Sequence, residues 1–197
     1  MFVSFEGLDG SGKTTQAERL AAAFRADGRD VVATREPGGT PFGEEVRRLV
    51  LEGHDMSPWA EAALFAAARA ELADRVIAPS LQARKDVICD RYIDSSLAYQ
   101  GIARGLGVDK VLELNLVATQ GLLPDRTVLV LVHPEVALGR SRPSDRIERE
   151  SLDFHRAVDK AYRALATMFP NRIVTVDGSR APDEIAEEIR GRLRELS

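Results

Sequence analysis

The chain has 197 residues, of which 44% are hydrophobic and 29% are charged, and its formal net charge is −4. This composition is typical of a globular protein and predicts a single domain over residues 1–197. The acidic balance argues against a nucleic-acid partner, because a surface that follows a phosphate backbone needs an excess of lysine and arginine. Local arginine clusters still fit a small anionic substrate.

The sequence has no pattern that is typical of a secreted protein or of a membrane-spanning segment. The single cysteine, Cys89, cannot form an intramolecular disulfide, and residues 1–5 lack the basic flank and the long apolar run of a signal peptide. No apolar stretch approaches the roughly 20 residues that cross a bilayer. We therefore expect a cytoplasmic protein without a membrane partner.

Five short apolar runs rich in Val, Ile and Phe alternate with helical patterns along the chain. This alternation predicts an α/β fold, in which helices cover a parallel sheet. The expected strands are 2–5, 31–33, 87–89, 128–132 and 173–176, and the expected helices lie near 13–26, 58–83, 109–119, 134–140, 147–168 and 182–195.

The segment from Gly7 to Thr14 matches the pattern G-x-x-x-x-G-K-[ST] between a predicted strand and a predicted helix. Its glycines let backbone N–H groups point at phosphate oxygens, while Lys13 supplies charge and the Thr14 hydroxyl reaches Mg²⁺. A glycine-rich turn formed by chance is the alternative, which the flanking strand and helix disfavour. The residues expected to hold the phosphates of ATP are Gly7, Leu8, Asp9, Gly10, Ser11, Gly12, Lys13, Thr14 and Thr15.

Asp90 closes the third apolar run, so its carboxylate should stand at the carboxyl end of a central strand. There it can hold Mg²⁺ or the waters of the ion. The alternative is an aspartate that begins the next turn, and the residues alone leave both interpretations open.

Arg69 interrupts an apolar stripe that also contains Phe65 and Leu72 on the helix expected over 58–83. An arginine on such a face either extends outward to solvent or donates its guanidinium to a buried ligand, with Phe65 one turn away able to stack on a ring. The isolated pattern favours the solvent-directed interpretation.

Residues 141–148 form a proline-containing connection between two expected helices and suit a short lid. Arginines that close onto a transferring phosphoryl group stabilise its charge and exclude water. A solvated run of mixed charge is the alternative. The arginines in or beside this segment are Arg140, Arg142, Arg146 and Arg149.

Five sequence blocks in the same order closely resemble the thymidylate kinase family, and the match spans nearly the whole chain. The resemblance favours the functional interpretations of Asp90 and Arg69 over their alternatives. The blocks are Phe5-Glu6-Gly7-Leu8-Asp9-Gly10-Ser11-Gly12-Lys13-Thr14-Thr15, Thr34-Arg35-Glu36-Pro37-Gly38-Gly39-Thr40, Phe65-Ala66-Ala67-Ala68-Arg69, Asp90-Arg91-Tyr92 with Ser95-Ser96-Leu97-Ala98-Tyr99-Gln100-Gly101, and Asp145-Arg146-Ile147-Glu148.

The resemblance implies a P-loop NTPase fold with a five-stranded parallel sheet, a homodimer, and transfer of the γ-phosphoryl of ATP to dTMP on the way to dTTP. It also implies Mg²⁺ as cofactor, held near Thr14 and Asp90, and a cis Glu36-Pro37 bond. By similarity, Phe65 stacks on thymine, and Arg69 with Ser96 or Gln100 bonds its edge. The other implied contacts to dTMP are Arg91 and Arg35 at the phosphate, Asp9 at the 3′-hydroxyl and Tyr99 against the deoxyribose.

Gly10 stands where one branch of the family carries a catalytic arginine, so the chain resembles the other branch, whose arginine lies in the lid. Arg142 is the candidate, joined in catalysis by Lys13 and Arg91, while Arg140 and Arg146 are possible substitutes for Arg142.

Three other functions compete with this prediction. Another nucleoside monophosphate kinase would differ only in its acceptor. A GTPase would need an Asn-Lys-x-Asp motif, which the sequence lacks. A binding module without activity would lack phosphate-clamping arginines such as Arg91.

Overall fold

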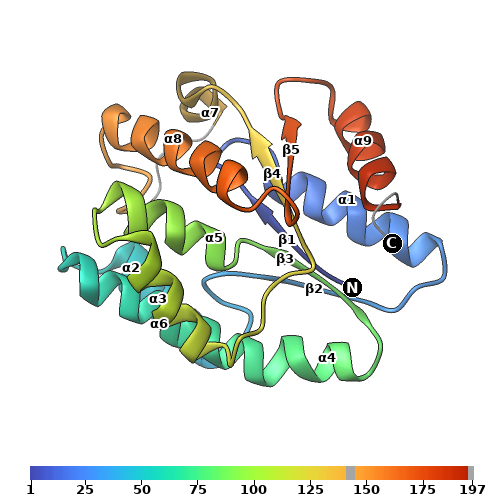
Figure 1. Cartoon of the computed structure of the whole chain (residues 1–197), viewed down its shortest axis with the longest axis horizontal. Helices are drawn as coiled ribbons and strands as arrows, with labels where there is room; N and C mark the ends of the chain where they lie inside the picture. Colours follow the sequence, from blue (N-terminus) through green and yellow to red (C-terminus); the bar gives the residue numbers. More distant parts are fainter. Residues whose placement is uncertain (141–144, 195–197) are drawn as a thin grey trace.

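The computed structural model describes residues 1–140 and 145–194. In this part of the chain five strands form one sheet in the order β2-β3-β1-β4-β5, and all neighbouring strands are parallel. Helices cover both faces of the sheet (Figure 1). The strands are Phe2–Glu6 (β1), Val31–Arg35 (β2), Asp86–Asp90 (β3), Arg126–Leu131 (β4) and Ile173–Asp177 (β5).

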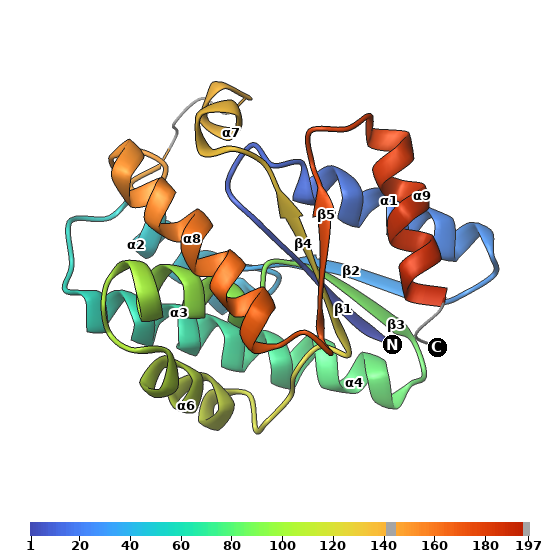
Figure 2. The same ribbon diagram turned by 45° about the horizontal axis from the view of Figure 1, so that its top comes forward.

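The helices are unevenly divided between the two faces. Lys13–Ala26 (α1) and Pro182–Arg194 (α9) lie side by side on one face, while most of the others lie on the opposite face (Figures 1 and 2). The short helix Pro134–Arg140 (α7) follows β4. The remaining helical segments are Pro41–Glu52 (α2), Pro58–Leu72 (α3), Ala73–Ile77 (η1), Ala78–Gln82 (α4), Ile93–Ser96 (α5), Leu97–Ala103 (η2), Val108–Ala118 (α6) and Leu152–Met168 (α8).

Alternation along β1 explains why the sheet has two cores. Val3 and Phe5 are fully buried against Leu20 of α1 and Ile189 of α9, whereas Phe2 belongs to the other core. Successive side chains of a strand point to opposite faces, so apolar residues at both odd and even positions suit a strand covered on both sides.

The strands agree with the sequence-based expectation, but two helices were missed and one was placed too early. The sequence pattern predicted no helix over 41–52 or 93–103, and it predicted that α8 starts at residue 147, whereas α8 begins at Leu152. Ser151 caps that helix by accepting the Phe154 N–H at 3.2 Å. None of the helices among the described residues is long and apolar enough to span a membrane.

Three neighbouring strands end at the same level and bring the sequence motifs together. Phe5 of β1 and Arg35 of β2 are both paired with Asp90 of β3. The P-loop, the Arg35 segment and the turn at Arg91 therefore leave the sheet at one edge, the carboxyl edge where open α/β folds bind their ligands.

Candidate active site

The P-loop lies between β1 and α1, as the motif predicted. Gly7 and Gly10 have φ values of 143° and 79°, in the region that favours glycine. A Cβ at Gly7 would come within 2.5 Å of the Val130 carbonyl oxygen, and one at Gly10 within 2.1 Å of the Ala137 carbonyl oxygen. The loop therefore packs closely against β4 and α7. It leads directly into the N-terminus of α1, and the backbone N–H groups of such a loop and helix start bind phosphate.

Asp9 joins the P-loop to the turn after β3. Its Oδ1 accepts hydrogen bonds from Lys13 Nζ at 2.9 Å and from Arg91 Nη2 at 2.7 Å. Burial disfavours the charged carboxylate, but Arg91 and Lys13 outweigh that effect and hold the pKa of Asp9 well below its usual range. A carboxylate therefore stands between the two cations expected to act in catalysis.

Arg91 is held by partners that the sequence analysis did not single out. Its Nη1 donates to Ser95 Oγ at 3.0 Å and to Tyr162 OH at 3.3 Å. Both hydroxyls in turn donate to Glu6 Oε2, at 2.5 Å and 3.0 Å. Because those hydroxyl hydrogens are directed at Glu6, their oxygen lone pairs are free to accept from Arg91. Glu6 thus orients the arginine through two intermediates.

Glu6 is 1% exposed, and this environment changes its titration. Burial raises the pKa of Glu6 to about 7, and the charge of Asp94 adds to the increase, while Arg91 and the hydrogen bond from Ser95 oppose it.

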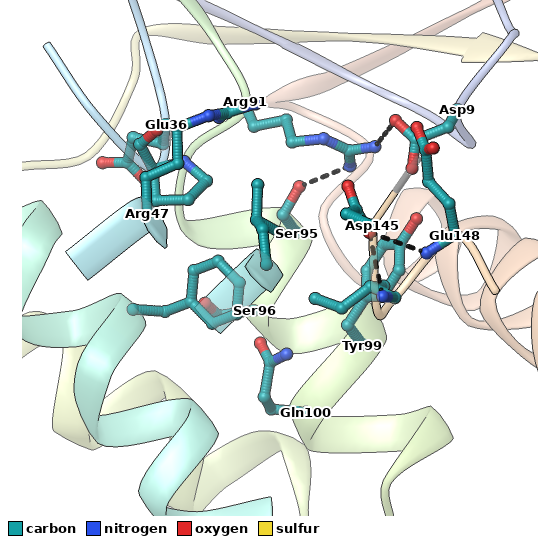
Figure 3. A pocket seen from close by; sticks show the side chains of 14 residues that line it. Asp9, Glu36, Arg47, Arg91, Ser95, Ser96, Tyr99, Gln100, Asp145 and Glu148 are labelled. Atoms are coloured by element: carbon teal, nitrogen blue, oxygen red, sulfur yellow. Dashed lines mark hydrogen bonds and ion pairs between the residues drawn. The ribbon is translucent and has the colours of Figure 1, made fainter. Parts of the chain in front are cut away.

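A pocket with an empty volume of about 580 Å³ opens beside Arg91 (Figure 3). Six of the residues predicted to bind dTMP or to act on it line this pocket: Asp9, Phe65, Arg91, Ser96, Tyr99 and Gln100. Residues without an assigned role also line it, among them Glu36, Arg47, Ser95, Asp145 and Glu148. Arg47 lies on α2, which explains why it was missed together with that helix.

Two predicted acceptor residues are not among the side chains that line the pocket. Arg69 is 1% exposed behind the wall, where it pairs with Glu36, Nη2 to Oε2 at 2.6 Å, and donates to Ser96 Oγ at 2.9 Å. It also donates to Asn115 and to the Tyr92 carbonyl. Arg69 thus faces inward and not to solvent, and it supports two pocket residues, whereas its contact with the thymine edge stays a prediction.

Arg35, the last residue of β2, does not line this pocket. Its Nη2 is 3.4 Å from both oxygens of Glu44, and it lines a separate groove with Thr14 and Asp90. Arg35 therefore does not line the pocket in which its contact with the acceptor phosphate was predicted. Arg47 does line that pocket, and it donates to the Pro37 carbonyl at 3.0 Å. The Glu36-Pro37 bond is cis, as the resemblance implied.

Thr14 and Asp90 meet as expected for a divalent cation site. Thr14 Oγ1 donates to Asp90 Oδ2 at 2.5 Å, and Asp90 Oδ1 is buried without a hydrogen-bond partner in the described part of the chain. A hydroxyl and a carboxylate with an unused oxygen suit a hard cation. Among residues 1–140 and 145–194, no three His, Cys, Asp or Glu side chains form a metal cluster.

The lid lies partly outside the described residues, and Arg142 is among those not described. Arg140 donates to the Gly178 carbonyl at 3.1 Å. Arg146 is held by α2 and α3, since it pairs with Glu61, Nη2 to Oε2 at 2.6 Å, and donates to the Val50 carbonyl.

A P-loop and an arginine-bearing pocket for a second ligand, joined through Asp9, define a class of protein: a P-loop nucleoside monophosphate kinase. A family model described as thymidylate kinase matches residues 5–189. The chain is 48% identical to the thymidylate kinase of Synechococcus sp. (strain JA-3-3Ab) over 96% of its own length and 93% of the relative. It is 46% identical to that of Symbiobacterium thermophilum, with coverage of 100% and 94%.

A solved structure of thymidylate kinase from Ehrlichia chaffeensis superimposes with a TM-score of 0.81 and 33% identity, covering 98% of both chains. The chain belongs to the thymidylate kinase family. The resemblance to the family, the fold class and the enzyme class are thus confirmed, whereas the catalytic arginine in the lid and the roles of other single residues stay predictions.

Proposed function

We propose that the protein transfers the γ-phosphoryl group of ATP to dTMP, giving ADP and dTDP, in the synthesis of dTTP. The observation that carries this proposal is the position of Asp9, which accepts from Lys13 on the donor side and from Arg91 on the acceptor side. A single carboxylate thereby fixes the spacing of two cations that must reach the same transferring group.

On the donor side the P-loop N–H groups and Lys13 bind the β- and γ-phosphates of ATP. Mg²⁺ is the divalent cation best suited to Thr14 and Asp90, and when bound it neutralises charge on the phosphate oxygens. Charge that develops on the phosphoryl group is met by Lys13 and Arg91, with Arg142 of the lid as the candidate for a further arginine.

On the acceptor side the pocket residues divide by chemistry. Phe65 stacks on the thymine ring, and Ser96 and Gln100, supported by Arg69, recognise its polar edge. Tyr99 lies against the deoxyribose, and Asp9 accepts from the 3′-hydroxyl. The acceptor phosphate meets Arg91, and Arg47 joins Arg35 as a candidate for the second cation.

A homodimer in the cytoplasm completes the proposal. Val117 on α6 is 76% exposed and Trp59 on α3 is 46% exposed, and burial of such apolar side chains would favour association with a second copy. Cytoplasmic placement follows from the location of ATP and deoxynucleotide pools.

Product analysis tests the reaction directly. Purified protein incubated with ATP, dTMP and Mg²⁺ should form dTDP and ADP in equal amounts, and EDTA should stop the reaction. Formation of ADP without dTDP would show an ATPase and contradict the proposal.

A further inference from the structure

Glu61 is a buried carboxylate that does not line the base pocket but contacts Gln100, a residue that does. Glu61 lies in the first turn of α3 and is 2% exposed. Its Oε1 accepts a hydrogen bond from Gln100 Nε2 at 2.9 Å, and its Oε2 pairs with Arg146 Nη2 at 2.6 Å. Arg104 Nη2 lies 3.4 Å from the same Oε2. Two segments distant in sequence from Glu61, the stretch 100–104 and Arg146, therefore converge on one side chain.

The charge state of Glu61 determines what it can do for Gln100. Burial disfavours its ionisation, but the hydrogen bonds from Gln100 and Arg146 and the charge of Arg104 outweigh that cost, and the pKa of Glu61 lies below its usual value. An ionised carboxylate only accepts hydrogen bonds. The Gln100 amide must therefore direct its NH₂ at Glu61, and a rotation by half a turn would bring two oxygens together.

Fixing one end of the amide also fixes the other. Gln100 lines the pocket from η2, with its side chain directed into it near Ser96 and Tyr99 (Figure 3). With Nε2 held by Glu61, the end presented to a ligand is the acceptor Oε1. A pyrimidine with an N3–H group can donate to that oxygen, whereas cytosine has a lone pair at N3 and would face it with repulsion.

We propose that Glu61 is a positioning residue for base selection: by locking the orientation of the Gln100 amide, it makes the pocket accept thymine and uracil and reject cytosine. This inference rests on the proposed function, because it places the pyrimidine in this pocket. Glu61 never touches the ligand, and its influence passes entirely through Gln100.

The test exchanges the carboxylate for an amide of the same shape. In Glu61→Gln the new NH₂ can donate to Gln100 Oε1, so Gln100 is free to turn its own NH₂ to the pocket, where it suits N3 of cytosine. The ratio of kcat/KM for dTMP to kcat/KM for dCMP should fall about 10- to 100-fold, since a mismatched buried polar group carries a cost of that size. Glu61→Ala removes the acceptor altogether and should lower the same ratio, which keeps the test available if Glu61→Gln does not fold.

Arg104→Gln is the matched control, because it alters the charge beside Glu61 and leaves the acceptor of Gln100 in place. Its base preference should equal that of the wild type, even if its rates differ. An unchanged ratio in folded Glu61→Gln, or an equal fall in Arg104→Gln, would overturn the inference. Failure of the wild-type protein to phosphorylate dTMP would instead refute the proposed function, so the two failures are distinguishable.

Discussion

Arg91, in the turn after β3, donates to Asp9 in the P-loop, with Nη2 2.7 Å from Oδ1. Lys13 donates to that same oxygen at 2.9 Å. One carboxylate therefore links the cation expected at the donor phosphates to the cation expected at the acceptor phosphate. A substitution of either cation should alter the position of the other.

Lys13→Ala should lower kcat by about 10²-fold or more, because the variant loses the P-loop charge that follows the β- and γ-phosphates. Steady-state kinetics with ATP and dTMP measure the effect. Lys110→Ala, at an exposed position of α6, is the control and should keep the wild-type rate. Near-normal kcat in Lys13→Ala would refute the role assigned to the P-loop.

Gly10→Ala should lower the free energy of unfolding more than Gly28→Ala, although the two glycines have almost the same φ, 79° and 80°. Both variants carry the cost of a left-handed residue, about 1–2 kcal/mol. At Gly10 the new Cβ also lies 2.1 Å from the Ala137 carbonyl oxygen, whereas at Gly28 it meets nothing within 4 Å. Overpacking should add about 1–3 kcal/mol at Gly10.

Urea unfolding of the two glycine variants measures this difference, and turnover should fall only in Gly10→Ala because the P-loop or α7 must move. Equal destabilisation by the two substitutions would contradict the close approach of α7. With this contact in place, any side chain at position 10 would meet the backbone of α7.

Glu6→Gln should change how stability depends on pH. With its pKa raised to about 7 from an ordinary 4.5, Glu6 binds a proton in the folded state that the unfolded chain releases between these values. Stability should therefore fall as pH rises through this window, by up to about 3 kcal/mol from this group. Glutamine stays neutral, so the variant should lack this loss. Parallel stability curves for variant and wild type between pH 4.5 and 7 would show that Glu6 does not titrate as argued.

Arg142→Ala should lower kcat by about 10³-fold or more with little change in KM for dTMP, as expected for an arginine that meets the phosphoryl group in the transition state. Arg142→Lys should recover only part of the rate, because lysine lacks the planar fork. Arg146→Ala should reduce kcat less, since that side chain is held by Glu61. Wild-type kcat in alanine variants of all the lid arginines would refute a catalytic lid.

The strands and the P-loop could be predicted because their signals are local: short apolar runs rich in Val, Ile and Phe, and glycines at fixed spacing before Lys13. The start of α2 also carries a local signal, the pair Thr40-Pro41, although no helix was predicted there. In the structure Thr40 accepts the Gly43 N–H at 2.9 Å and Pro41 occupies the first turn. The start of α8 could have been found in the same way from Ser151.

The helical segment over 93–103 gave no comparable signal. It contains serines and a glycine, which have low helix propensity, and part of it is π-helical, so its conformation depends on packing against α6 and α8. For the same reason the roles of Glu6 and Glu61 were not predictable, because each acts through partners more than 30 residues away.

Phosphoryl transfer to dTMP is best tested by a coupled assay of ADP release with a panel of acceptors. The acceptors are dTMP, dUMP, dCMP, dGMP and UMP, each with ATP and Mg²⁺. The account predicts that dTMP gives the highest kcat/KM. It predicts dUMP as a poorer substrate, since one methyl group contributes only about 1–3 kcal/mol in an apolar pocket, and little turnover of the others. If no monophosphate accelerates ATP turnover, or if another acceptor exceeds dTMP, the account is contradicted.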